Sequence, residues 1–351
     1  MNVAVVGLNI GQLHVASWIE LREWARVVAV CDVDEAKAEG LAGRLRGCDA
    51  VTDLRAICLR DDIDVVDLCT PPSLHFDHIR QVLEAGKHAI CEKPLVASLA
   101  DVDRLAELER ETGRRIMPIF QYRFGHGLQK LKLIVDTGIA GDAHTTNVEV
   151  AWRRRAEYYA VPWRGKWASE LGGVLLSHAV HALDMLCYIV GPAARVFART
   201  ATRVNPIEVE DCASASLTMA DGSLATVSAT LGSPAEISRH RFSFANLSAE
   251  SNTEPYTNSS DPWVVTGDTP EAEARIEEAL ATFEPEPEGY AGQFARWHTA
   301  VTGGRELPVT LADARASLEL ITALYVSARE GRDVALPLDS DDPAHEGWIP
   351  R

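Results

Sequence analysis

The chain has 351 residues, more than one hydrophobic core usually holds, so two domains are expected. Hydrophobic residues make up 46% of it and charged residues 24%, and the formal net charge is −17 at pH 7. This charge argues against nucleic acid or an anionic membrane as a partner, because both present phosphate groups to a bound protein.

The cysteines predict a reducing compartment. There are seven of them, no CxxC spacing occurs, and several lie in apolar runs, so buried reduced thiols are the expected state. The N-terminus enters a strand pattern without a basic leader, and no apolar run is long enough to span a bilayer. We therefore expect a cytoplasmic protein.

The first 122 residues alternate short β-branched runs with helical stretches. The strand runs are NVAVVG, VVAVCD, DVVDLCTPP, HAICEKP and RIMPIFQYRF. Ser98 is the expected N-cap of one intervening helix, and Gly113 closes that helix. This alternation predicts an α/β domain over residues 1–122, with a doubly wound parallel sheet.

From residue 123 the pattern changes to longer strands in succession. These are HTTNVEVAW, ARVFARTATRV, CASASLTMA, SLATVSATLG and RHRFSFAN, interrupted by a helix within 172–191. The ADGS turn indicates a hairpin. Residues 246–289 are rich in Ser, Asn, Pro and Glu and are expected to form loops at the sheet edge, with one short helix. We predict a second, α+β domain over 123–351 with a large, mostly antiparallel open sheet.

The turn after the first strand has the pattern of a dinucleotide site. Gly7 follows the strand, Gly11 opens a helix, and Asp32 ends the next strand about twenty residues later. Gly7 permits the tight turn, the helix N-terminus attracts a pyrophosphate, and Asp32 can accept hydrogen bonds from ribose hydroxyls. Asn9 stands where such turns usually have glycine, but asparagine tolerates positive φ and its amide can donate to a phosphate or to the loop.

The residues after Asp32 favour NAD over NADP. Val33, Asp34 and Glu35 follow it, with no Arg or Lys among them. A 2′-phosphate would therefore meet negative charge, which makes NADP the less favoured cofactor.

Several segments together resemble the Gfo/Idh/MocA family of sugar and polyol oxidoreductases. They are TPPSLHFDHIRQVLEAGKHAICEKPL (70–95), QYRF (121–124), WRGKW (163–167), GGVLLSHAVHALDML (172–186), VED (209–211) and the tail ALPLDSDDPAHEGW. The resemblance implies a Rossmann domain followed by an α+β domain whose open sheet often mediates dimers or tetramers.

The resemblance also implies roles for individual residues. Lys93, which stands rigidly between a strand end and a proline, is the expected catalytic lysine, and His181 is the expected general base. The residues expected near the substrate are Tyr122, Arg123, Ser177, His178 and Asp184. The residues expected near the cofactor are Gly7, Asn9, Ile10, Gly11, His14, Asp32, Thr70, Pro71, Pro72, His75, Glu92, Lys93, Trp163 and Arg164.

Two other interpretations of the second-domain motif remain open. His178, His181 and Asp184 are spaced by three, so they could share one helix face and bind a metal, or they could simply be packed in a helix. No fourth ligand is evident, so no metal is expected. Family members often carry aspartate where Ser177 stands, so the partner of His181 must differ here, and His178 or Asp184 could compensate.

The sequence leads to one functional hypothesis and two rivals. The hypothesis is an NAD-dependent oxidoreductase acting on a secondary hydroxyl of a sugar, glycoside or cyclitol, in a homodimer or homotetramer formed through the second-domain sheet. The rivals are an NAD-using glycosidase of the same family and a non-catalytic regulator that senses NAD or sugar. Retention of both Lys93 and His181 favours an enzyme, because a sensor needs no base.

Overall fold

The computed structural model describes residues 1–350 and divides the chain into two compact units. The first unit comprises Met1–Phe120 together with Tyr290–Arg315, and the second comprises Gln121–Gly289 together with the chain from Ala316 onward. Sequence analysis assigned the segment Tyr290–Arg315 to the second domain. In the structure it packs with the first unit, a difference that arises from contacts distant in sequence.

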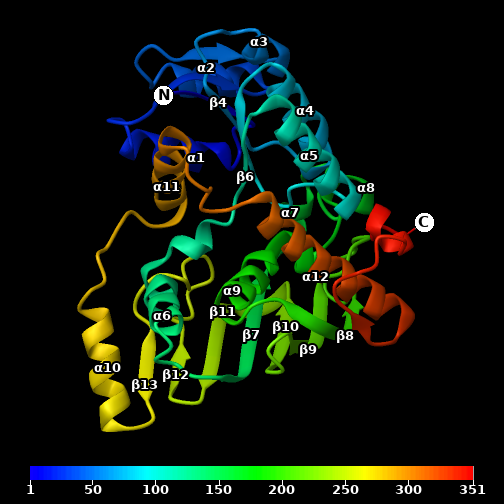
Figure 1. Cartoon of the computed structure of the whole chain (residues 1–351). Helices are drawn as coiled ribbons and strands as arrows, with labels where there is room; N and C mark the ends of the chain where they lie inside the picture. The colour runs from blue at the N-terminus through cyan, green and yellow to red at the C-terminus, as the bar shows by residue number, and fades with distance from the viewer. Residues whose placement is uncertain (351) are drawn as a thin grey trace. The chain divides into compact units, whose positions relative to one another are not determined.

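The first unit is built on a six-stranded parallel sheet, coloured blue to cyan in Figure 1. Its strands are β1 (Asn2–Val6), β2 (Arg26–Cys31), β3 (Asp49–Val51), β4 (Val65–Leu68), β5 (His88–Cys91) and β6 (Ile116–Pro118). They lie in the order β3-β2-β1-β4-β5-β6, so the connection reverses direction between β1 and β4. Ligands of doubly wound sheets bind beyond the strand ends at this switch point. The predicted α/β fold of the N-terminal part is confirmed.

Helices connect these strands. They are α1 (Gly11–Glu20), α2 (Glu35–Ala42), α3 (Leu54–Cys58), α4 (His75–Glu84) and α5 (Leu99–Thr112), with a 3-10 turn over Pro72–Leu74. The expected ends of α5 are confirmed: the Ser98 side chain accepts from the Asp101 N–H, and Gly113 adopts the left-handed conformation that closes the helix.

The helix α11 (Gly289–Gly303), which sequence analysis did not identify, belongs largely to the first unit. Phe294 stacks on Trp18 of α1 with ring centroids 4.3 Å apart. The Gln293 side chain accepts from the Phe120 N–H at 3.1 Å and donates to the Pro118 carbonyl at 2.7 Å. These buried contacts fix the returning segment against the end of β6.

The second unit is built on an eight-stranded sheet in the order β13-β12-β11-β7-β10-β9-β8-β14. The strands are β7 (Ala143–Arg153), β8 (Ala193–Ala201), β9 (Cys212–Met219), β10 (Leu224–Thr230), β11 (Gly232–Phe244), β12 (Leu247–Glu250), β13 (Val264–Gly267) and β14 (Val334–Ala335). Only the β7–β10 pair is parallel among the described pairings, so the predicted, mostly antiparallel sheet is confirmed.

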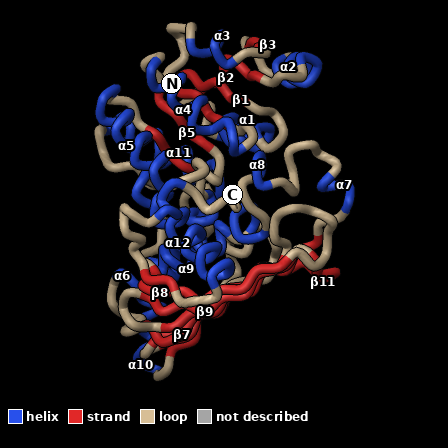
Figure 2. The backbone as a smooth tube through the Cα atoms, turned by 90° about the vertical axis from the view of Figure 1, so that its right-hand side faces the viewer, coloured by secondary structure: helices blue, strands red, loops and turns tan. Residues whose placement is uncertain are grey.

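The helical elements of this unit are a 3-10 turn (Gln121–Phe124), α6 (His126–Asp136), α7 (Ala156–Tyr159), α8 (Trp167–Glu170), a π-helix (Val174–His178), α9 (Val180–Val190), α10 (Pro270–Leu280), α12 (Leu311–Glu330) and a 3-10 turn (Pro343–Glu346). Among them, α9 and α12 cover one face of the sheet, as the edge-on view in Figure 2 shows. Helix α12 begins in the first unit and continues in the second.

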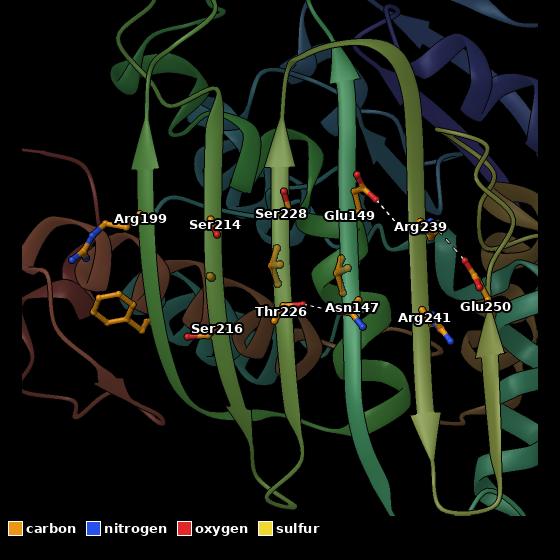
Figure 3. Close-up of a pocket in the computed structure, with 14 residues that line it drawn as sticks. Asn147, Glu149, Arg199, Ser214, Ser216, Thr226, Ser228, Arg239, Arg241 and Glu250 are labelled. Carbon is orange, nitrogen blue, oxygen red and sulfur yellow. Dashed lines mark hydrogen bonds and ion pairs between the residues drawn. The ribbon is translucent and has the colours of Figure 1, made fainter. Parts of the chain in front are cut away.

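Side chains alternate across the sheet. Val148 and Val227 are buried under the helices, while Asn147 and Thr226 lie on the opposite face, where the threonine hydroxyl donates to the asparagine oxygen at 2.8 Å. That opposite face carries mostly small and charged residues and holds a depression of about 700 Å³ (Figure 3). It is therefore an open face, as the resemblance implied.

The expectation of loops over 246–289 is wrong for part of that segment. Strands β12 and β13 extend the sheet there beyond β11, whereas α10 confirms the expected short helix. Each of the two strands has only four residues, too few to show a clear alternation in the sequence. In the intervening loop, Asn258 is only 1% exposed and donates to His240, so it is packed within this unit.

No described helix is by itself long and apolar enough to cross a membrane. One bent pair, Trp167–His178 with Val180–Val190, passes on length and composition alone. All seven cysteines are free; Cys31, Cys69 and Cys91 are buried, and the other four are partly accessible.

Candidate functional site

The turn after β1 is shaped around Gly7. Its φ is +91°, and a Cβ there would come within 2.5 Å of the Cys69 carbonyl oxygen, so no other residue fits. Its N–H donates to the Cys31 carbonyl at 2.8 Å, which ties the turn to the end of β2. Helix α1 then starts at Gly11 with no side-chain cap from Ile10. Its first N–H groups are thus available to an anionic ligand, as a pyrophosphate requires.

Asp32 lies directly beside this turn. Its carboxylate accepts from the Leu8 N–H at 2.8 Å and from the Asp34 N–H at 3.0 Å. Each oxygen retains a second lone pair for a ribose hydroxyl. The donor set and the glycine turn therefore fit a dinucleotide.

A cation does stand near Asp32, although none of the three residues that follow it is basic. The Lys37 ammonium lies 3.7 Å from the Asp32 carboxylate and donates to the Asn9 side-chain oxygen at 3.1 Å. Sequence analysis weighed only the three residues after Asp32. Lys37 lies in the first turn of α2, which turns its side chain back toward the β2 end.

The loops after β4 and β5 are joined by His75. Its Nδ1 lies 2.8 Å from the Pro94 carbonyl and its Nε2 2.8 Å from the Thr70 carbonyl. His75 is completely buried, and burial lowers the pKa of its ring. It therefore lies beneath the Thr70-Pro71-Pro72 loop and shapes that loop from below.

A buried polar cluster lies below the turn, centred on His14. Its Nδ1 lies 2.9 Å from Asp67 and its Nε2 3.1 Å from Glu92, and Asp67 also accepts from Trp18. Burial opposes a charge on His14, but Asp67 and Cys69 raise its pKa well above the usual value. The cluster therefore places one imidazole between two carboxyl groups beneath the turn.

This cluster connects to Lys93 through Glu92. One Glu92 oxygen accepts from the Tyr290 hydroxyl at 2.8 Å, and the other accepts from the Lys93 N–H at 3.0 Å. His14 was expected near the cofactor, but it has no exposed surface and contacts Glu92 instead. The side chains of His14, Asp67 and Cys69 are close enough to suggest a metal site. His14 and Asp67 are instead paired with each other, and burial raises the pKa of the Cys69 thiol to about 12.

In the second unit, His181 lies in α9 and is buried. Its ring stacks on Tyr122 with centroids 4.5 Å apart. One turn further on, Asp184 forms a buried two-point pair with Arg123, with oxygen–nitrogen distances of 2.8 and 2.6 Å. Asp184 is therefore held by Arg123, which weakens the idea that it compensates for Ser177.

His178 has a different environment from His181. It ends the π-helix, so the three residues 178, 181 and 184 do not share one regular helix as expected. The Arg154 Nε–H donates to its Nε2 at 3.2 Å, and its ring packs edge-on against Trp152. The Arg154 guanidinium thus occupies the lone pair of that nitrogen.

Ser177 has a carboxylate partner that sequence analysis missed. Its hydroxyl donates to Glu170 at 3.2 Å, and Glu170 is buried. Arg164 lies 3.7 Å from the same carboxylate and stacks between the rings of Tyr158 and Trp163. Glu170 lies between two of the family-like segments and has no characteristic spacing from either, so the sequence alone did not indicate its contact with Ser177.

The backbone before α9 is unusually constrained. Leu171 has φ of 69°, which non-glycine residues rarely adopt, and the π-helix follows shortly after. A Cβ on Gly173 would come within 1.7 Å of the Glu210 carbonyl oxygen. The Glu210 carboxylate accepts from the N–H groups of Gly173 and Leu175 at 3.0 Å, and burial raises its pKa to about 7. The VED segment thus anchors the chain that leads to His181.

Two family models match this chain. Residues 1–120 match the oxidoreductase family with an NAD-binding Rossmann fold, and residues 128–245 match the GFO/IDH/MocA C-terminal domain.

Individual relatives agree with these matches. D-glucoside 3-dehydrogenase from Escherichia coli is 31% identical over 56% of each chain, and inositol 2-dehydrogenase from Rhizobium meliloti is 27% identical over 93% of this chain and 96% of its own. The WlbA dehydrogenase from Chromobacterium violaceum, solved with NADH and UDP-GlcNAcA, superposes with a TM-score of 0.85 at 28% identity, over 97% of this chain and 96% of that one. The chain spans 56–63% of the length of the curated relatives it first matches. Matched in both its N-terminal and its C-terminal domain, the chain belongs to the Gfo/Idh/MocA oxidoreductase family.

Proposed function

We propose that this protein is an NAD-dependent oxidoreductase that acts on a secondary hydroxyl of a sugar, glycoside or cyclitol. The observation that carries the proposal is the arrangement of Gly7, the uncapped start of α1 and Asp32 at the sheet switch point. Relatives with this type of domain are named as dehydrogenases of glucosides and inositol. When bound, the cofactor supplies a hydride acceptor, and the protein positions the groups around it.

We assign each residue of the site to the part of the cofactor that it would contact. Gly7, Asn9, Ile10, Gly11 and Asp32 would hold the pyrophosphate and adenosine. The Thr70-Pro71-Pro72 loop, shaped by His75, would border the nicotinamide. The resemblance adds Trp163 and Arg164 as contacts from the second unit.

We assign the proton transfer to His181 and the stabilisation of the substrate oxygen to Lys93. His178 is a poor base because Arg154 occupies its Nε2, and Asp184 is paired with Arg123. These two pairings leave His181 as the stronger candidate in its segment. Glu92 holds the Lys93 backbone, so the lysine would donate a hydrogen bond to the reacting oxygen from a fixed base.

The experiment is a screen of sugars, glycosides and cyclitols that follows NADH absorbance. For an active substrate, Lys93→Ala and His181→Gln are each expected to reduce kcat by a factor of about 100 or more while NAD binding, measured by calorimetry, persists. His144→Gln, at an exposed position on β7, is the matched control. The proposal would be contradicted if the wild-type protein neither bound NAD nor turned over any substrate in the screen. It would also be contradicted if neither substitution changed kcat.

We also propose that the open sheet face binds a second copy of the chain. Small residues such as Ser214 and Ser216 permit close approach of two sheets, and Arg239 lies 3.2 Å from Glu149 and 3.9 Å from Glu250. A face that carries both charges can pair with itself about a two-fold axis. The free cysteines support a reducing location, for which we propose the cytoplasm.

Light scattering tests the paired face. Ser216→Arg places a long cation among small residues and is expected to raise the dissociation constant about tenfold or more. Glu277→Arg is the control, because it also makes the chain more positive but lies on the exposed side of α10. A wild-type monomer at micromolar concentration would contradict the assignment.

A further inference from the structure

The backbone that leads to His181 contains a strained turn. Leu171 caps α8 with a φ of 69°, in the left-handed region that residues other than glycine seldom adopt. Such a conformation persists only where the surrounding structure fixes it, and it is often found at functional sites. Two permissive glycines, Gly172 and Gly173, follow before the π-helix Val174–His178 begins. The local sequence therefore leaves the direction of the π-helix open, and contacts from elsewhere must set it.

One of these contacts comes from the C-terminal segment. The Trp348 Nε1–H donates to the Leu171 carbonyl at 2.7 Å. Trp348 is 1% exposed and Leu171 is 3% exposed, so the hydrogen bond is buried. In Figure 1 the C-terminal segment, coloured red, lies beside α8, which Leu171 caps. Trp348 therefore supplies the donor for the carbonyl of the strained residue.

The C-terminal segment is fixed to α12, which gives Trp348 a defined position. The Leu338 N–H donates to the Glu319 carboxylate of α12 at 3.0 Å. The indole of Trp348 stacks on Tyr325 of the same helix, with centroids 6.3 Å apart. The Tyr325 hydroxyl donates to Glu210 at 2.8 Å, and that carboxylate also holds the N–H groups after the turn. Helix α12 thus supports the turn on both its carbonyl side and its N–H side.

The turn sets the place of two groups of the candidate site. Glu170, the residue before Leu171, accepts from the Ser177 hydroxyl at 3.2 Å across the turn. The π-helix leads directly into α9, and His181 lies in the first turn of α9. A base must lie within hydrogen-bond reach of the proton that it takes, and a misplacement of about 1 Å can lower a rate about a hundredfold. The geometry of the turn therefore bears on the reaction.

We propose that Trp348 is a positioning residue for the reaction, which fixes the Leu171 turn and through it the place of His181. The inference rests on the proposed function, since it takes His181 as the base. Without the indole donor, the Leu171 carbonyl becomes an unsatisfied buried group. The turn then relaxes toward other conformations that the two following glycines permit, and His181 moves with the π-helix.

Trp348→Phe tests the proposal, because phenylalanine keeps an aromatic ring against Tyr325 but has no N–H donor. With an active substrate, kcat is expected to fall about tenfold, whereas KM for NAD⁺ and the calorimetric stoichiometry of NAD⁺ binding stay within about twofold. Trp263→Phe is the matched control, since it removes an indole donor to another backbone carbonyl of the same unit, that of Asn258 at 2.8 Å. The control is expected to lower the unfolding midpoint in the same direction as Trp348→Phe without lowering kcat.

Hydrogen exchange measures the turn itself and does not depend on turnover. In Trp348→Phe the amide groups of residues 172–181 are expected to exchange at least about fivefold faster than in the wild-type protein, because the segment opens more often. In Trp263→Phe they should exchange at the wild-type rate.

The outcomes separate this inference from the proposed function. If the wild-type protein is active and Trp348→Phe has an unchanged kcat, the inference is overturned and the oxidoreductase proposal stands. Equal falls of kcat in Trp348→Phe and Trp263→Phe also overturn it, since a general loss of stability would then explain both. Unchanged exchange of residues 172–181 overturns it as well, because the turn would not depend on the indole. A wild-type protein that turns over no substrate refutes the proposed function, and with it the role of His181 on which the inference rests.

Discussion

His240 should make the folded protein lose stability in mild acid. It lies on β11 with no exposed surface, and its Nε2–H donates to the Ala182 carbonyl at 2.9 Å. Its Nδ1 accepts from the Asn258 side-chain amide at 3.0 Å. This tautomer is neutral, and burial lowers the pKa of the ring from 6.5 to about 4. Protonation would turn the accepting nitrogen into a donor that faces another donor.

The sign and size follow from proton linkage. Between the two pKa values the unfolded chain binds a proton that the folded chain excludes, so stability falls as pH falls through this window. The full loss of unfolding free energy from His240 is about 3 kcal/mol, since its pKa falls from 6.5 to about 4 on folding. Between about pH 7 and about pH 5 the loss from His240 is about 2 kcal/mol.

Urea unfolding at these two pH values measures the effect. Other groups also titrate, so the informative quantity is the difference between the wild-type protein and His240→Gln, which keeps a donor toward Ala182 but cannot take up the proton. The variant should show about 2 kcal/mol less acid destabilisation. His144→Gln, on the surface, is the control. An equal pH dependence in the wild-type protein and His240→Gln would refute the reasoning.

Two further predictions concern the two halves of the candidate site. Gly173→Ala should destabilise the fold by more than about 3 kcal/mol, because the new Cβ meets the Glu210 carbonyl at 1.7 Å, whereas Gly40→Ala in α2 meets nothing within 4 Å and should stabilise slightly; comparable unfolding midpoints in the two variants would contradict this. Glu92→Gln removes a carboxyl group from the buried cluster that holds the Lys93 backbone, and kcat should fall about tenfold with the unfolding temperature little changed. An unaltered kcat would show that the cluster is structural only.

Much of the fold could be predicted from short windows of sequence. The strand–helix alternation of residues 1–122 identified the parallel sheet, since each element carries its own hydrophobic period. Ser98 and Gly113 marked helix ends because capping is local chemistry. Gly7 and Asp32 were recognisable because the geometry of a dinucleotide turn fixes their spacing.

Other features needed the folded chain. Strands β12 and β13 were hidden because each has only four residues, too few to show a clear alternation. The segment Tyr290–Arg315 joins the first unit through the contacts of Phe294 and Gln293, which are far in sequence from their partners.

The residues of the candidate site also fall into those that the sequence predicts and those that only the fold reveals. Sequence by itself determined which residue types stand at the strand ends, including Lys93 and Asp32, because strand ends follow from local pattern. Only the tertiary structure decided that Lys37 meets Asp32, that Glu170 meets Ser177 and that His14 contacts Glu92. Such charge pairings depend on where distant segments come together, and no local period in the chain encodes that meeting point.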